Sequence, residues 1–227
     1  MNPLQRVVIN KFHIAIFRVE FSILGGSLYG SNADNNLYHL DLSTGTASLI
    51  GATGAAGLLQ SFAIIDGIGY SQDVIGNTLY RIDLGTGQSL AAGAYGHLGG
   101  GVTGLTHSGD HLYEARIAWR DLVEIDIHDG SIVSVTGMHN LGNDTSIAYT
   151  DGTFWTIPAL DDSLYRLDPN TGAASLVHTG LSLPHVTALT GIQQSIRVSE
   201  PTTIALLILG LVLVAAGRAM PLSSMVV

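Results

Sequence analysis

The stretch TLYRIDLGTG at residues 78–87 decides the fold, because variants of it recur three more times along the chain. In each copy, the first and third residues before an aspartate have apolar side chains. A glycine follows that aspartate four residues later. The other copies are NLYHLDLSTG at 36–45, DLVEIDIHDG at 121–130 and SLYRLDPNTG at 163–172. Successive aspartates are separated by 42, 43 and 42 residues. This regularity predicts a repeat architecture in which each unit is one supersecondary element.

Each copy is interpreted as a β-hairpin. Alternation places Tyr80, Ile82 and Leu84 on one face of a strand. The aspartate side chain can accept hydrogen bonds from the turn amides, and the glycine suits the positive φ that closes such a turn. We therefore expect the repeat aspartates to be structural, although paired carboxylates also perform acid–base chemistry in many sites. The predicted turn residues are Asp41, Gly45, Asp83, Gly87, Asp126, Gly130, Asp168 and Gly172.

A second, looser recurrence of strand, short turn and strand lies between the hairpins. It reads FSILGGSLYGS at 21–31, FAIIDGIGYS at 62–71, VTGLTHSGDHLYEA at 102–115 and TSIAYTDGTFWTI at 145–157. Four strands in about 42 residues are typical of one blade of a β-propeller. The sequence therefore predicts an all-β, β-propeller-like array of about four 42-residue four-stranded blades over residues 19–192. VTALTGI at 186–192 repeats the first strand of a fifth period, so the blade number stays open between a closed ring of four and part of a larger ring.

Composition excludes several classes of function. Only 12% of the 227 residues are charged, and 9 basic residues stand against 18 acidic ones, for a net charge of -9. A nucleic-acid backbone would be repelled by this charge. Because the chain has no cysteine, it forms no disulfide, thiolate metal site or cysteine nucleophile.

The C-terminal part has a different character. PTTIALLILGLVLVAAG at 201–217 carries no charge and is bounded by Glu200 and Arg218, which predicts a short transmembrane helix. Arg218 favours an orientation with residues 1–200 outside the cytoplasm. At the other end, FHIAIF at 12–17 is too short for the apolar core of a signal peptide, so we expect a truncated start. The expected organisation is an unassigned segment 1–18, the propeller 19–192, a linker 193–200 with a Ser-Glu-Pro motif, a transmembrane or sorting helix 201–218 and a tail 219–227.

These residues resemble two known families. The repeat LYxIDxxTG is similar to blades of bacterial quinoprotein-like and YVTN-like propellers. Residues 198–218 resemble a PEP-CTERM sorting signal, in which Ser199, Glu200 and Pro201 correspond to the short motif and Arg218 to the basic end. Ser199 departs from the first proline of the family motif. The resemblance implies export in a Gram-negative bacterium, processing by an exosortase and association with exopolysaccharide. Alternatively, Glu200 and Pro201 simply cap an ordinary membrane anchor.

The blades offer few candidates for chemistry. His107 and His111 are better interpreted as loop histidines than as metal ligands. A polar loop is likewise the better interpretation of the SNADNN stretch at 31–36, whose side-chain oxygens could otherwise bind calcium. We expect Trp155 to pack between blades, whereas Trp119 and Tyr113 could offer aromatic surface to sugar rings. We predict no catalytic residue, metal or cofactor.

Three hypotheses about function follow. The first is an exported, surface-associated, non-enzymatic propeller that binds a ligand or has a structural role, with an exosortase, the membrane through residues 201–217 and exopolysaccharide as partners. The second is a propeller enzyme, quinoprotein-like dehydrogenase or lyase-lactonase, whose dispersed active site leaves no linear motif. The third is a plain membrane-anchored or truncated propeller fragment.

Overall fold

The computed structural model describes residues 20–24, 27–32, 34–41, 43–73, 75–94, 102–116, 119–138, 141, 144–158 and 163–181. All the regular secondary structure in these residues is β-strand. The strands are β1 (Glu20–Leu24), β2 (Ser27–Ser31), β3 (Asn36–Asp41), β4 (Thr46–Ala52), β5 (Leu59–Ile65), β6 (Ile68–Asp73), β7 (Thr78–Asp83), β8 (Ser89–Ala94), β9 (Val102–Ser108), β10 (His111–Arg116), β11 (Asp121–Ile125), β12 (Ile132–Met138), β13 (Asp144–Thr150), β14 (Thr153–Pro158), β15 (Leu164–Leu167) and β16 (Ala174–His178).

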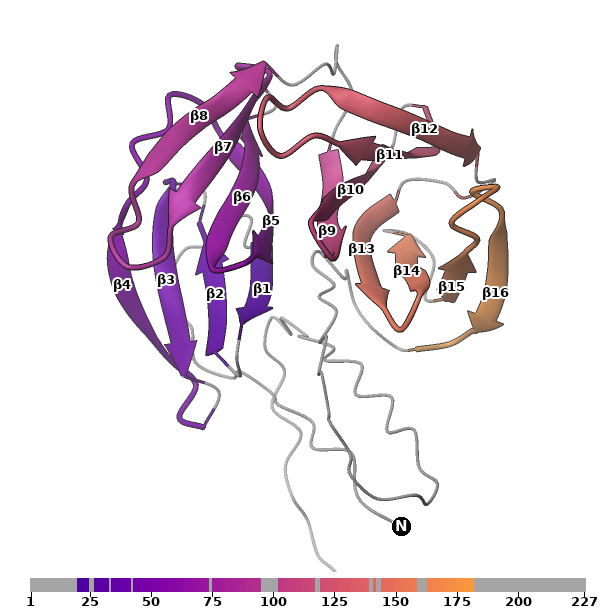
Figure 1. Ribbon diagram of the computed structural model, residues 1–227. Helices are drawn as coiled ribbons and strands as arrows, with labels where there is room; N and C mark the ends of the chain where they lie inside the picture. The colour runs from indigo at the N-terminus through magenta and orange to yellow at the C-terminus, as the bar shows by residue number, and fades with distance from the viewer. Residues whose placement is uncertain are drawn as a thin grey trace, which may run out of the picture.

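The strands form four antiparallel sheets of four strands, each in chain order. We refer to β1–β4 as blade 1, β5–β8 as blade 2, β9–β12 as blade 3 and β13–β16 as blade 4. Figure 1 shows the blades following one another in an arc, from blade 1 in indigo to blade 4 in orange. The predicted all-β propeller arrangement of about four four-stranded blades is therefore confirmed, with four blades in the described residues.

The first strand of each blade lies on the inside of the arc. β5 packs against β1 and β9, and β9 packs against β13. Within the described part of the chain, no comparable packing joins β13 to β1. Three inner strands of seven residues, β5, β9 and β13, thus line the inside in succession.

Apolar clusters fill the three boundaries between blades. Leu37 of blade 1 packs with Phe62 and Ile82 of blade 2. Tyr70 of blade 2 packs with Leu112 and Val123 of blade 3, and similar contacts join Ala115 of blade 3 to Phe154 of blade 4. Because a sheet inside this arc is covered on both faces, its strands are apolar on both sides, as the sequence shows.

Glycine backbones make the outer contacts between blades. Each of the first three outer strands, β4, β8 and β12, carries a glycine near its end, and each of these glycines lies against the Asp-Gly turn of the next blade. A β-carbon at Gly51 would lie 2.3 Å from the Thr86 carbonyl oxygen, and one at Gly93 would lie 2.0 Å from that of Asp129. At Gly137 it would lie 1.7 Å from the carbonyl oxygen of Thr171. Any larger residue at these three positions would push two blades apart.

The predicted terminal segments lie outside the described residues. These are the N-terminal segment 1–18, the linker 193–200, the helix 201–218 and the tail 219–227. Among the described residues, the structure has no helix of the length and apolarity that a membrane span requires.

Candidate functional site

The four repeat aspartates lie at the outer hairpin turn of their own blade, so they do not gather into one site. Each turn is closed by a hydrogen bond of 2.8 Å from the glycine N–H to the aspartate carbonyl, as from Gly45 to Asp41. The glycines have positive φ, 70° at Gly45 and 79° at Gly87. Corresponding turns stand at 126–130 and 168–172. This geometry is that of a structural turn.

The aspartate side chains accept hydrogen bonds inside the same turns. Asp41 Oδ1 accepts from the Ser43 backbone N–H at 2.7 Å, and Asp83 Oδ1 accepts from that of Gly85 at 2.9 Å. Asp126 and Asp168 bind the N–H two residues further on in the same manner. The Ser43 hydroxyl and backbone N–H lower the pKa of Asp41 to about 2. These carboxylates are therefore fixed as hydrogen-bond acceptors.

Blade 3 departs from the repeat at one buried position of its second strand. The residue opposite the centre of the third strand is Gly30 in blade 1, Ser71 in blade 2 and Thr156 in blade 4, whereas blade 3 has Glu114. The hydroxyls of Ser71 and Thr156 donate to carbonyl oxygens of their inner strands, at 2.6 and 2.7 Å. Among the described residues, Glu114 makes no corresponding bond to its inner strand.

Glu114 is buried between blades 2 and 3. Its exposed fraction is 0%, and it points to the same side of its sheet as Leu112, which packs against blade 2. Among the described residues neither carboxylate oxygen of Glu114 has a hydrogen-bond partner of normal geometry, and the same holds for the amide atoms of the equally buried Gln72 in blade 2. Unpaired buried polar groups cost free energy, so this pair is a candidate for a role other than stabilising the fold.

The surroundings of Glu114 change its protonation. Burial raises the pKa of the Glu114 carboxyl from 4.5 to about 8, while the Arg116 charge and the Gln72 amide oppose this rise and Asp121 adds to it. At neutral pH the carboxyl group is therefore mostly protonated and can donate a hydrogen bond. Carboxyl groups in this state act as general acids or as hydrogen-bond donors to ligands.

An ion pair lies beside this carboxyl group. Arg116 Nε donates to Asp121 Oδ1 at 2.7 Å, and Arg116 Nη2 donates to the second carboxylate oxygen. Arg116 is 8% exposed and Asp121 is 6% exposed, so the pair is almost fully removed from water. The Arg116 guanidinium also lies 4.8 Å from the centre of the Trp119 ring. We call Gln72, Glu114, Arg116, Asp121 and Trp119 the blade 3 polar cluster.

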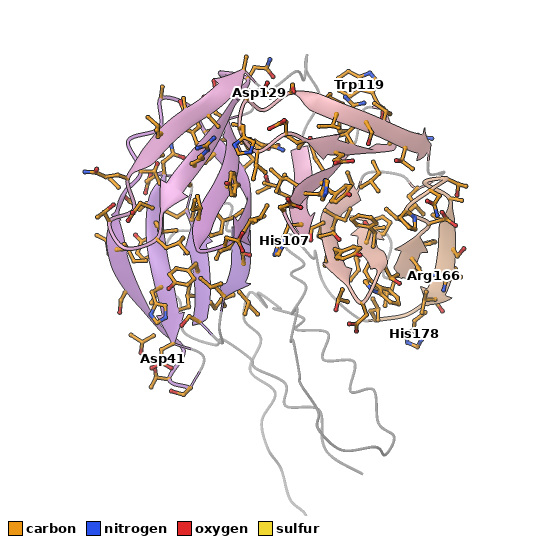
Figure 2. All side chains as sticks on the ribbon, viewed as in Figure 1. Asp41, His107, Trp119, Asp129, Arg166 and His178 are labelled. Atoms are coloured by element: carbon orange, nitrogen blue, oxygen red, sulfur yellow. The ribbon has the colours of Figure 1, made fainter. Side chains whose placement is uncertain are left out.

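Trp119 is the exposed member of the blade 3 polar cluster. Its exposed fraction is 37%, and Figure 2 shows it at the rim of blade 3 next to β12. The other candidate aromatic residues do not join it. Tyr113 packs edge-on against Phe154, with ring centres 4.9 Å apart. Trp155 packs with Ala148 and Ile157 on the face of blade 4 turned away from blade 3. Among the described residues it therefore has no contact with a second blade of the kind that we expected.

The two candidate histidines have separate environments. His107 pairs with Leu112 across β9 and β10, and its Nδ1 lies 3.2 Å from the Gly109 carbonyl oxygen. His111 is hydrogen-bonded through Nδ1 to Glu124 and lies 3.3 Å from Asp110 through Nε2. Within the described residues no group of three or more His, Cys, Asp or Glu side chains could hold a metal ion.

The polar loop of blade 1 links blade 1 to the start of blade 2 through hydrogen bonds. Asn35 has a φ of 57°, and its side-chain amide donates to the Gly57 carbonyl oxygen. The Asn35 Oδ1 accepts from the Leu59 N–H at 3.0 Å, which ties the start of β5 to blade 1. The Asp34 N–H and the Asn36 N–H both bind Asn32 Oδ1. These contacts give the loop a structural role.

The predicted sorting residues Ser199, Glu200, Pro201 and Arg218 lie outside the described residues. The blade 3 polar cluster, by contrast, was not anticipated as a site. The sequence does contain a signal for it, because aligning the four units on their aspartates places Glu114 where the others have the uncharged residues Tyr29, Ser71 and Thr156. Its partners Gln72 and Arg116 show no such signal, since their meeting depends on how two blades pack.

Comparisons with solved structures agree with the fold. The chain is similar to the glutaminyl cyclase of Myxococcus xanthus, with a TM-score of 0.62, 12% identity, and coverage of 79% of this chain and 83% of that one. It is also similar to a structural genomics protein of unknown function from Bacteroides thetaiotaomicron, with a TM-score of 0.59, 13% identity, and coverage of 75% and 53%. A third match is the computationally designed Ika8 protein, with a TM-score of 0.48, 17% identity, and coverage of 74% and 51%.

The similar structures differ from this chain in length and in sequence. The chain spans about half the length of the designed protein and of the Bacteroides protein. No protein-family model matches the chain, and no curated protein matches it in sequence. At these low identities the likeness to the Myxococcus and Bacteroides proteins establishes the propeller-like fold alone.

Proposed function

We propose that this chain is an exported, surface-associated β-propeller that binds a ligand without catalysing a reaction and is routed by its C-terminal segment. The observation that carries the proposal is the order of the segments. The described blades end by Leu181, and the Ser-Glu-Pro motif, the uncharged run 201–217 and Arg218 follow in the sequence. This order resembles a PEP-CTERM signal, so an exosortase, the membrane and exopolysaccharide are the proposed partners.

The blade 3 polar cluster is the proposed ligand-binding region. Trp119 provides partly exposed aromatic surface, and the planar face of such a ring packs well against a sugar. Arg116, held by Asp121, lies against the same ring. Because the aromatic ring and the polar groups are already held in place, they lose little conformational entropy when a ligand binds.

The first experiment concerns sorting. The complete reading frame, tagged before Val198, is expressed in its native host, the cells are fractionated, and the mature C-terminus is determined by mass spectrometry. We expect a surface or extracellular chain that ends between Ser199 and Pro201. An intact Val227 in the membrane fraction would reduce the segment to a plain anchor, and a cytoplasmic full-length chain would contradict export.

The second experiment concerns binding. Purified full chain is mixed with exopolysaccharide isolated from the same host, and co-sedimentation is measured. Trp119→Ala should lower the bound fraction at least several-fold, whereas Leu90→Ala should leave it unchanged because Leu90 is an exposed apolar residue of β8 outside the cluster. Equal binding by the two variants would contradict the proposed region.

Glu114 favours a second candidate function, a propeller enzyme with a dispersed active site. Its buried, mostly protonated carboxyl group is suited to general acid chemistry at neutral pH. The test uses the full chain with a panel of sugar, lactone and alcohol substrates, together with metal analysis and an absorption spectrum. Turnover that is lost in Glu114→Gln would favour the enzyme over the binding protein. No turnover by a folded wild-type chain over this panel would count against it.

A further inference from the structure

The repeated contacts between blades have two unmatched ends. Gly51, Gly93 and Gly137 each lie against the turn of the next blade. Gly180, which lies two residues after the end of β16, has open space where a β-carbon would be, and so has Gly45 in the turn of blade 1. The outer side of blade 4 and the turn of blade 1 therefore each lack the neighbour that the other blades have within the described residues.

The sheet faces beside these ends are apolar. On blade 4, Ala148 and Ile157 form a cluster with Trp155 and Leu164 on the face turned away from blade 3. The Trp155 Nε1 is buried there, without a hydrogen-bond acceptor among the described residues. On blade 1, Leu28 and Leu40 form a cluster on the face turned away from blade 2. Apolar faces of this kind need another element to cover them.

The chain leaves blade 4 along the path it takes after earlier blades. Leu181, three residues beyond the end of β16, packs against the Ala148 and Ile157 cluster. Ala55, three residues beyond β4, packs into the boundary between blades 1 and 2, and Leu141, three residues beyond β12, packs into that between blades 3 and 4. In each of those cases the chain goes on to form the next inner strand.

The sequence after Leu181 contains an inner strand at the required distance. VTALTGI at 186–192 is identical to VTGLTHS of β9 at four of seven positions. It begins eight positions after the end of β16, and β9 begins eight positions after the end of β8. Its start also lies 42 residues after that of β13, the same step that separates β13 from β9.

We propose that residues 186–192 form a fifth inner strand, which lies between β13 and β1 and joins the face of blade 4 turned away from blade 3 to the face of blade 1 turned away from blade 2. The occupant is thus a segment of this chain. The alignment pairs Leu189 with Ile147, and Ile147 packs next to Gly104, whose equivalent in blade 4 is Ser146. Leu189 should accordingly lie next to Ser146.

A disulfide tests this contact cleanly, because the chain has no cysteine of its own. The double variant Ser146→Cys with Leu189→Cys is prepared as the full chain in mild detergent and oxidised. We expect an intramolecular disulfide, seen by mass spectrometry of the linked peptides and by faster migration without reductant. The matched control replaces Ser175, which is exposed on the outer strand β16, in place of Ser146, and should form no such disulfide.

Two results of the disulfide experiment would overturn the proposal. A folded double variant that forms no disulfide would show that the segment lies elsewhere, and a covalent dimer would show that a second copy occupies these two faces. If the double variant does not fold, Leu189→Asp keeps the proposal testable. We expect Leu189→Asp to lower the urea midpoint, with Leu222→Asp in the predicted tail having little effect. Equal midpoints for the two variants would also overturn the proposal.

Discussion

Gly51 lies against the carbonyl oxygen of Thr86 across the boundary between blades 1 and 2, where a β-carbon at residue 51 would come within 2.3 Å of that oxygen. The neighbouring atoms belong to backbone in a hydrogen-bonded turn, so they cannot rotate away as a side chain would. The outer contact between these blades therefore requires glycine at position 51, because there is no room there for a β-carbon.

The first prediction concerns this contact. Gly51→Ala should lower the free energy of unfolding by about 1–3 kcal/mol, because the methyl group forces the two backbones apart. Gly85→Ala is the control, since a β-carbon there would meet only the Asp83 carboxylate at an ordinary distance of 3.4 Å. Urea unfolding followed by far-UV circular dichroism gives both values. Equal stability of the two variants would contradict the packing described here.

Part of the fold could be predicted from sequence because it is local. The alternation before Asp83 and the glycine at 87 specify a strand and its turn within ten residues, and the 42-residue period then specifies four units. The positive φ of Gly87 and the hydrogen bonds to Asp83 are those that such a turn uses.

The candidate site could not be predicted because it depends on packing between units. Gln72 and Glu114 are 42 residues apart in sequence, and they come near each other only through the register of β6 and β10 in facing sheets. The same limit applies to Asn35, whose amide binds Gly57 and Leu59 in the next blade. The sequence does not indicate whether the hydrogen-bond partner of a polar loop residue belongs to the same blade or to the next one.

The second prediction concerns the buried ion pair. Arg116→Met leaves the Asp121 carboxylate buried without its counter-charge, so it should lower the free energy of unfolding by about 3–5 kcal/mol. The double variant Arg116→Met with Asp121→Asn should be more stable than Arg116→Met alone. The exposed Arg166→Met serves as control, with an expected change within about 0.5 kcal/mol. Fluorescence of Trp119 should also change in Arg116→Met, because the guanidinium leaves the ring. A double variant as unstable as the sum of the single losses would count against the pairing.

The third prediction concerns two histidines whose pKa values move in opposite directions. The hydrogen bond that the His111 imidazole donates to the Glu124 carboxylate raises the pKa of His111, whereas burial lowers the pKa of His107. NMR titration of the imidazole protons should therefore find His111 protonated at a pH where His107 is neutral. Glu124→Gln should move the pKa of His111 down toward 6.5 and leave that of His107 nearly unchanged. A common midpoint for both rings in the wild-type chain would contradict the geometry.

The last prediction concerns Glu114 and the pH dependence of stability. The pKa of its carboxyl group is 4.5 when unfolded and about 8 in the folded chain, so the unfolded state releases this proton first as pH rises. Its contribution is fully present below pH 4.5 and is lost between pH 4.5 and pH 8. Because a tenfold change in proton affinity corresponds to about 1.4 kcal/mol, the difference between these two pKa values limits the whole loss to roughly 5 kcal/mol.

Glu114→Gln removes this proton while keeping the shape of the side chain. We expect the variant to gain stability relative to the wild-type chain as the pH rises from about 5 to about 8, measured by urea unfolding at each pH. The charged groups facing Glu114, Arg116 and Asp121, remain in both chains, so the difference between the two curves isolates the carboxyl group. Asp34→Asn, which removes an exposed carboxylate, should give a curve parallel to the wild type. If the Glu114→Gln curve were also parallel, Glu114 would be ionised in the folded chain at neutral pH, and its candidacy as a general acid or hydrogen-bond donor would fail.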